Sequence, residues 1–92
     1  MLLDVREDSE WDDGHVAGAI SLPMSRLAAE VQSLPADRVL ICVCHVGMRS
    51  AMAARALTGA GWNAVNLAGG MMSWYAAGLP IVQDADQADA VA

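Results

Sequence analysis

Apolar residues in this chain occur as short runs that alternate with polar or glycine-containing segments. Short apolar runs bounded by turn residues predict strands, whereas apolar residues that recur every three or four positions predict one face of a helix. On these criteria strands are expected at 2–5, 20–22, 38–43 and 64–67, and helices at 25–34, 50–59 and 71–77. This alternation predicts an α/β domain with a small, mostly parallel sheet flanked by helices. A brief helical turn is also expected after the first strand, with Ser9 as its cap and Asp12 as partner in a loose capping box.

The run at 38–43 is the strongest strand signal, because it contains five successive apolar residues and no alternation. Such a strand is typical of a parallel sheet that is covered on both faces. Cys44 follows this strand directly, and Ser50 opens the next predicted helix. Backbone N–H groups at a helix start, together with a nearby cation, stabilise a thiolate. Ligands of such sheets also bind beyond the carboxyl ends of strands, so Cys44 is the candidate nucleophile.

Length and composition indicate a single small domain at 1–83, followed at 84–92 by an acidic tail that is expected to be frayed. The chain has 92 residues, of which 55% are hydrophobic and 17% charged, so a well-filled core is expected. No apolar run approaches the ~18 residues that would span a bilayer, and the N-terminus has no basic leader, so a soluble, cytoplasmic protein without a membrane partner is expected. The net charge of −6 and the absence of lysine argue against nucleic acid as a partner.

The two cysteines, Cys42 and Cys44, are separated by one residue, a spacing that would strain a disulfide within a strand. Reduced thiols are therefore expected, with Cys42 in the core. A zinc site built from these cysteines with His45 and His15 is not expected, because adjacent ligands do not suit a tetrahedral cage. The sequence predicts neither a metal nor a cofactor.

Four motifs in a fixed order resemble a single rhodanese-like domain, and the resemblance extends from Leu2 to about Ile81. Any one of these motifs would be weak alone, but their joint order is specific. They are D-V-R at 4–6 followed by Glu10, G-H-V-A-G-A-I-S-L-P at 14–23, C-H-V-G-M-R-S at 44–50, and G-G-M-M-S-W at 69–74 followed by G-L-P.

The resemblance implies a five-stranded parallel sheet and a cysteine that carries sulfur as a persulfide. Cys44 matches that cysteine. The implied activity is a sulfurtransferase of the thiosulfate type, which moves sulfane sulfur from a thiosulfate-like or persulfide donor to a thiophilic acceptor. Its partners would be a small-molecule donor and acceptor, or a protein thiol or sulfur-carrier protein. The residues expected to bind the substrate follow the nucleophile: His45, Val46, Gly47, Met48, Arg49 and Ser50.

Alternatives remain for the chemistry of this loop. Four residues separate Cys44 from Arg49, one fewer than in the similar loop of cysteine phosphatases, so sulfur transfer is favoured over phosphatase or arsenate reductase chemistry. A sulfur-carrier or redox-sensing module without turnover is the non-enzymatic alternative. Arg49 could bind an anionic donor, or it could turn inward to hold loop carbonyls or Asp4. His45 could steer a substrate at the pocket mouth, or have no role.

Two departures from the family pattern have consequences. Some thiosulfate-using relatives carry a Lys or Arg in this loop where His45, Val46 and Met48 stand here, which weakens the expectation of tight thiosulfate binding. Family members also usually have a short strand and helix before the D-V-R strand, and this chain starts one residue ahead of that strand. The strand at 64–67 is therefore expected to be an exposed edge, covered by the Ile81–Val82 region or by a second copy in a homodimer.

Overall fold

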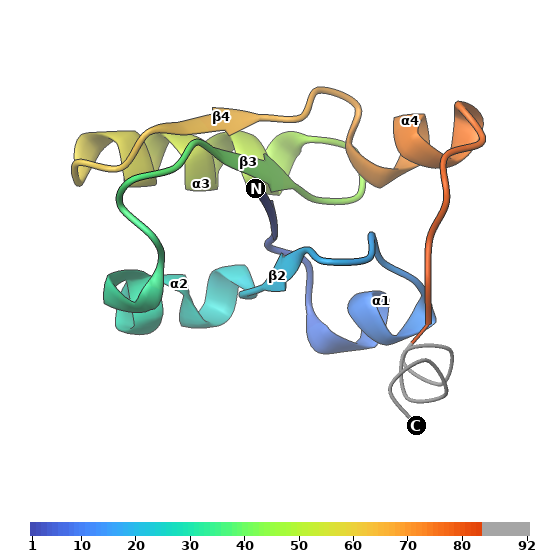
Figure 1. The fold of residues 1–92 in the computed structure, drawn as a ribbon, viewed down its shortest axis with the longest axis horizontal. Helices are drawn as coiled ribbons and strands as arrows, with labels where there is room; N and C mark the ends of the chain where they lie inside the picture. Colours follow the sequence, from blue (N-terminus) through green and yellow to red (C-terminus); the bar gives the residue numbers. More distant parts are fainter. Residues whose placement is uncertain (84–92) are drawn as a thin grey trace.

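The structure of the protein is a computed structural model, and it describes residues 1–83. The predicted acidic tail at 84–92 lies outside the described residues. Strands and helices alternate along the chain (Figure 1). In order they are β1 (Leu2–Asp4), α1 (Asp8–Asp13), β2 (Ile20–Ser21), α2 (Met24–Glu30), the 3-10 helix η1 (Val31–Ser33), β3 (Leu40–Val43), α3 (Met48–Gly59), β4 (Ala64–Asn66) and α4 (Gly70–Ala76).

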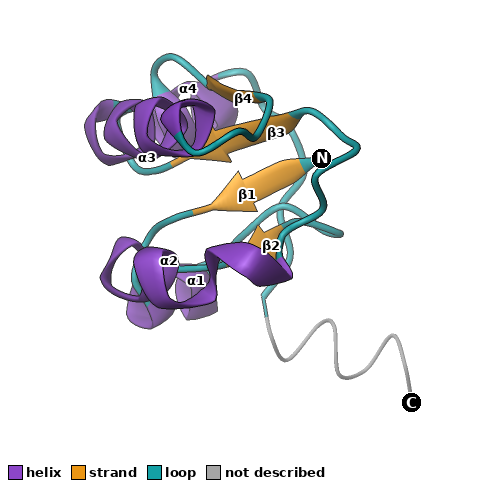
Figure 2. Cartoon of the chain, turned by 90° about the vertical axis from the view of Figure 1, so that its left-hand side faces the viewer, coloured by secondary structure: helices purple, strands orange, loops and turns teal. Residues whose placement is uncertain are grey.

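The described strands form one parallel four-stranded sheet with the order β2-β1-β3-β4. Helices α2 and α3 lie on one side of this sheet, and α1 and α4 lie on the other (Figures 1 and 2). This arrangement confirms the α/β prediction, although the described sheet has four strands and not the five that the family resemblance implies. None of the helices within residues 1–83 combines the length and the apolar character needed to cross a membrane.

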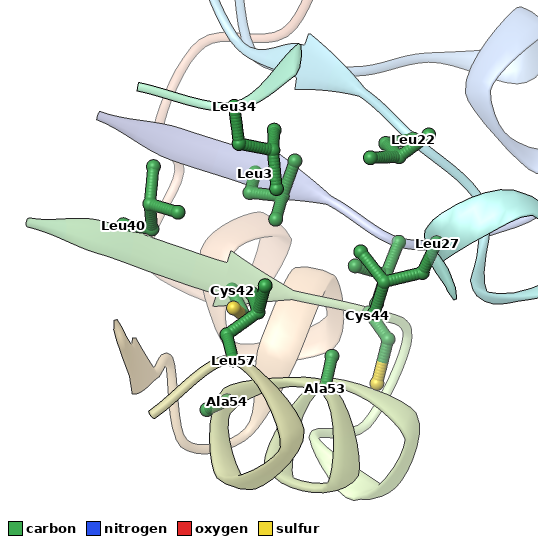
Figure 3. Close-up of a cluster of buried hydrophobic side chains, with 11 residues drawn as sticks. Leu3, Leu22, Leu27, Leu34, Leu40, Cys42, Cys44, Ala53, Ala54 and Leu57 are labelled. Atoms are coloured by element: carbon green, nitrogen blue, oxygen red, sulfur yellow. The ribbon is translucent and has the colours of Figure 1, made fainter. Parts of the chain in front are cut away.

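The core is one cluster between the sheet and the α2–α3 side, and its side chains point toward one another in Figure 3. Leu3 of β1 and Leu40 and Cys42 of β3 are fully buried, and Leu57 of α3 packs against them. Central strand β3 is buried except for Ile41, which is partly exposed. The apolar residues of β3 are therefore explained as predicted, because β3 is a central strand of a parallel sheet and is covered on both faces.

The predicted cap of the first helical turn is wrong. Glu7 is the N-cap residue of α1, and it forms a capping box with Glu10, whose carboxylate accepts the Glu7 N–H at 3.2 Å. Ser9 lies inside the first turn, two positions too late to cap it. Helix α3 likewise begins at Met48 and not at Ser50, because Gly47 takes the N-cap position. Helix α2 ends at Glu30 and the chain continues as η1.

Strand β4 is an edge of the described sheet, and Val65 at its centre is 47% exposed, so the predicted exposed edge is confirmed. The predicted covering of that edge by the Ile81–Val82 region is wrong. Val82 instead forms an antiparallel bridge with His15, through hydrogen bonds of 2.8 and 2.9 Å. The chain after α4 crosses toward α1, away from β4 (Figure 1). Dimerisation through the edge stays a prediction.

Helix α4 is fastened to the turn that follows β3. The N–H groups of Met71 and Met72 donate to the carbonyl oxygens of Cys44 and His45 at 2.8 and 3.0 Å. Gly70 makes this approach possible, because a Cβ atom there would overlap both carbonyl groups and its φ of +54° is in the left-handed region. The start of α4 therefore supports the backbone around Cys44.

We expect Gly70→Ala to destabilise the fold more than Gly78→Ala. Both residues have positive φ, at +54° and +71°, but no atom lies within 4 Å of a Cβ built on Gly78. Backbone strain alone should cost about 1–2 kcal/mol in Gly78→Ala. Displacement of the Cys44 and His45 carbonyls should bring the loss in Gly70→Ala to about 3 kcal/mol or more. Urea unfolding followed by tryptophan fluorescence measures both, and equal losses would contradict the proposed docking of α4.

Candidate active site

The Cys44 sulfur lies within a turn whose donors converge on it. The backbone N–H of Gly47 donates to Sγ at 3.1 Å and that of Ser50 at 3.4 Å. The hydroxyl oxygen of Ser50 lies 3.3 Å from Sγ. Cys44 is only 1% exposed, and its side chain points toward α3 in Figure 3. Such a ring of donors at a helix N-terminus stabilises an anion on the sulfur.

The shape of the turn follows from its place in the chain. Strand β3 ends at Val43 and α3 begins at Met48, so only four residues reverse the direction of the backbone. Gly47 has φ +105°, and a Cβ atom there would lie 3.2 Å from the backbone nitrogen of Gly69. A side chain at this position would be strained and crowded at once. Gly47 thus allows the turn to close while its own N–H faces the sulfur.

The two thiols are in opposite environments. Burial of Cys44 opposes its ionisation, but hydrogen bonds from the Ser50 hydroxyl and from the N–H groups of Ser50, Gly47 and Arg49 outweigh burial and lower its pKa. Burial without such donors raises the pKa of Cys42 to about 11. Cys42 is therefore a core residue, as predicted, and Cys44 is the thiol with thiolate character.

Arg49 is held by Glu10 of α1 in a two-pronged ion pair. Its Nη1 and Nη2 atoms donate to Oε1 and Oε2 of Glu10 at 2.6 and 2.8 Å. These bonds are the largest cause that raises the pKa of Arg49 above its ordinary value, with smaller contributions from Cys44. The expected inward arginine that holds loop carbonyls or Asp4 is not what the structure shows, because the Arg49 side chain is 37% exposed and pairs with Glu10. Nothing local in the sequence pairs Glu10 with a residue 39 positions away, so the motif alone gives Glu10 no role.

Asp4 forms an ion pair with a different arginine, Arg6. Arg6 donates to both carboxylate oxygens of Asp4, and its Nη2 also donates to the Gly14 carbonyl at 2.8 Å. Both side chains are almost fully buried, at 4% and 1% exposure. The pair ties the end of β1 to the turn before His15, which is itself buried and stacked on Trp11 with ring centroids 3.5 Å apart. These residues are structural supports of the site.

The remaining predicted loop residues face outward. His45 is exposed, Val46 is 48% exposed and Met48 is 75% exposed. None of them is hydrogen-bonded to the sulfur through its side chain in the described contacts. His45 contributes to a shallow cleft of about 260 Å³ beside the turn, with Arg6, Glu10, Asp13 and Tyr75 as the other lining residues. The structure therefore brings Gly47, Arg49 and Ser50 together around Cys44, and leaves the side chains of the other three exposed at the surface.

Asn66 is a site residue that sequence reasoning missed. Its Oδ1 accepts the Ser50 hydroxyl at 2.5 Å, and it is the last residue of β4. A polar residue at the carboxyl end of a strand next to β3 was a usable signal, because parallel strands end at the same edge of the sheet. Residues 1–83 contain no cluster of three or more side chains suited to hold a metal ion.

Comparison with known proteins identifies the family. The rhodanese-like domain family matches residues 1–77. The chain belongs to this family. A sulfurtransferase of Allochromatium vinosum is 36% identical to this rhodanese-like domain over 83 residues, which cover 89% of this chain and 78% of that protein.

Solved structures agree with this assignment. A rhodanese-related protein from Thermoplasma volcanium has a TM-score of 0.88 and 37% identity, and the match covers 91% of this chain and 84% of that one. A rhodanese-like domain protein from Staphylococcus aureus has a TM-score of 0.78 and 34% identity, with coverage of 80% and 72%. The resemblance inferred from the four motifs and the predicted fold class are both confirmed.

We expect Glu10→Gln to weaken this rhodanese-like domain in a pH-dependent way. Hydrogen bonds from Arg49 lower the pKa of Glu10 from 4.5 to about 2. A carboxyl with a lowered folded-state pKa stabilises the fold fully above its ordinary pKa, and this contribution is lost as pH falls through the folded value. Because the pair is partly exposed, the loss at pH 6 should be only about 1 kcal/mol, and it should shrink between pH 4.5 and about 2.

Urea unfolding of the wild type and of Glu10→Gln, each at pH 6 and at pH 3, measures the loss in the free energy of unfolding at the two pH values. Glu30→Gln is a matched control, because Glu30 pairs with Arg26 at 3.3 Å on the open surface, with side chains 51% and 48% exposed. That variant should change stability by less than about 0.5 kcal/mol. A loss in Glu10→Gln that is the same at both pH values would contradict the assignment of the pair.

Alkylation should distinguish the two cysteines. Both thiols are almost fully buried, so the difference lies in their thiolate character. In the folded protein iodoacetamide should modify Cys44 at neutral pH, because its pKa is lowered, and leave Cys42 unmodified, because its pKa is raised to about 11. Intact mass should show one adduct in the wild type and in Cys42→Ala, and none in Cys44→Ala. Two adducts would appear only after unfolding. Rapid modification of Cys42 in the native protein would refute this description.

Proposed function

We propose that this protein is a sulfurtransferase that carries sulfane sulfur as a persulfide on Cys44. The observation that supports this proposal is the convergence of N–H groups and a hydroxyl on a buried thiol at the end of β3. A sulfur anion, whether thiolate or persulfide, is the charge that this arrangement suits. The sulfurtransferase name of the Allochromatium vinosum relative is in line with it.

The proposed reaction has two steps. The Cys44 thiolate attacks the outer sulfur of the donor, a new S–S bond forms, and the donor's own bond to that sulfur breaks with its electron pair. Thiosulfate would leave as sulfite, and a persulfide donor as a thiolate. The nucleophilic acceptor, such as cyanide or a protein thiol, then attacks the outer sulfur of the Cys44 persulfide. Cleavage of that S–S bond returns the Cys44 thiolate, so covalent catalysis needs no net redox change.

The donor is held mainly by backbone amides in this proposal. Both Nη atoms of Arg49 are hydrogen-bonded to the Glu10 carboxylate. The exposed positions of the loop are His45, Val46 and Met48, and none of them is a Lys or an Arg. A donor with low charge, such as a persulfide, therefore fits the turn at least as well as thiosulfate. A protein partner that presents a thiol or persulfide is included in this donor and acceptor class.

The other chemistries considered for the loop have less support. Phosphate or arsenate would suit a wider cradle, whereas here Arg49 closes a loop with only four residues between it and Cys44. A carrier or redox-sensing module without turnover would use the same Cys44 persulfide or thiol, and only the second step separates it from an enzyme.

Incubation with thiosulfate, and separately with a small-molecule persulfide, should add one sulfur to the intact mass of the protein. Cys44→Ala should show no gain, because it lacks the nucleophile, and Cys42→Ala should load as the wild type does. Subsequent addition of cyanide should remove the sulfur and form thiocyanate.

Each other outcome identifies a different function. Loading that cyanide or a thiol cannot discharge would indicate a carrier. Failure to load from either donor, together with turnover of an aryl phosphate that requires Cys44, would refute the sulfur assignment.

A further inference from the structure

Ser50 lies between two acceptors at the centre of the site. Its Oγ is 3.3 Å from the Cys44 sulfur and 2.5 Å from Oδ1 of Asn66. Ser50 is fully buried, so water does not compete for its hydroxyl. Asn66 reaches this position because β4 runs parallel to β3, with Asn66 paired to Cys42 in the register.

A serine hydroxyl has one proton, so it can donate to only one of these acceptors at a time. When Cys44 is a neutral thiol, the side-chain amide oxygen of Asn66 is the stronger acceptor for the Ser50 hydroxyl. The thiol can then direct its own S–H toward the hydroxyl oxygen of Ser50. When the sulfur is an anion, a charge-assisted bond from the hydroxyl to sulfur is the stronger one. Ionisation of Cys44 therefore requires the Ser50 proton to turn from Asn66 to the sulfur.

We propose that Asn66 is a positioning residue that competes with the Cys44 sulfur for the single proton of Ser50. Its side chain holds the hydroxyl in place beside the thiol and gives up that proton when the sulfur becomes charged. Asn66 thus acts on Cys44 only through Ser50. This inference concerns the site of the proposed sulfur transfer, but it applies to the thiol itself and needs no sulfur donor.

Other charged and titratable groups near the sulfur are the same whether or not Asn66 is present. Arg49 at the start of α3 contributes to the charge around Cys44, and it is paired with Glu10 of α1. His45 is the adjacent loop residue and is exposed. Since none of these is altered by a change at position 66, their effects cancel in a comparison of variants.

The test is the pH dependence of Cys44 alkylation by iodoacetamide in four proteins: wild type, Asn66→Ala, Ser50→Ala and the double variant. Removal of the competing acceptor leaves the hydroxyl free for the sulfur anion. Asn66→Ala should therefore lower the midpoint of the alkylation profile by about half a unit to one unit, the size of one net hydrogen bond. In the Ser50→Ala background the same substitution should not move the midpoint. Ser50→Thr, which keeps a hydroxyl, should restore the effect of Asn66→Ala.

An equal shift in the presence and in the absence of the Ser50 hydroxyl would overturn the proposal, because Asn66 would then act through β4. An absent shift, or a rise of the midpoint, would overturn it as well. Circular dichroism checks the fold, and Asn66→Val, which lacks an acceptor but favours a strand, replaces Asn66→Ala if that variant does not fold. Alkylation requires no donor, so this result is independent of whether Cys44 accepts sulfur from thiosulfate or a persulfide.

Discussion

The hydrogen bonds that converge on the Cys44 sulfur depend on a turn that is held from three directions. Strand β3 fixes its start, because Cys42 and Leu40 are buried in the core. Helix α3 begins at its end and aligns further N–H groups with the sulfur. Helix α4 donates two backbone hydrogen bonds to the Cys44 and His45 carbonyls, so those groups face away from the sulfur. An anion on the sulfur is stabilised when N–H groups point toward it and carbonyl oxygens point away. Helix α3 supplies N–H groups on one side, and α4 holds the carbonyls on the other.

Ion pairs support this turn from α1 and β1 without adding free charge to it. Glu10 holds Arg49, and Asp4 holds Arg6, so both arginines near the site are neutralised by a carboxylate. A buried or half-buried pair contributes little net stability, but it does fix the positions of the groups that it joins. The groups that hydrogen-bond to the sulfur are amide N–H groups and one hydroxyl, whose orientation is set by the fold, and Arg49 adds its charge nearby while paired with Glu10.

The sequence predicted those features that depend on neighbours along the chain. The strand–turn–helix pattern and the placement of Gly47 follow from residues within ten positions of Cys44, and so the nucleophile and its loop could be located. Glu10 and Gly70 could not be located in this way, because they reach the loop through the topology of the fold, whereas Asn66 was signalled only by its place at the carboxyl end of a strand. The covering of β4 by the Ile81–Val82 region was wrong for the same reason. An apolar segment shows that it needs burial, but not which distant segment it will contact, and here Val82 pairs with His15 outside the sheet.

The net charge of −6 and a site built from dipoles act at different ranges. Charge repulsion reaches across about a Debye length, ~8 Å at physiological salt, and slows the approach of any anionic donor. The N–H groups of the turn act only at contact, where the sulfur is already within hydrogen-bonding distance. An anion therefore meets a long-range repulsion that a neutral group does not, before either comes within reach of these N–H groups. The net charge and the turn thus act on different steps, because the charge affects the approach of a group and the N–H groups stabilise negative charge on a sulfur that has reached them.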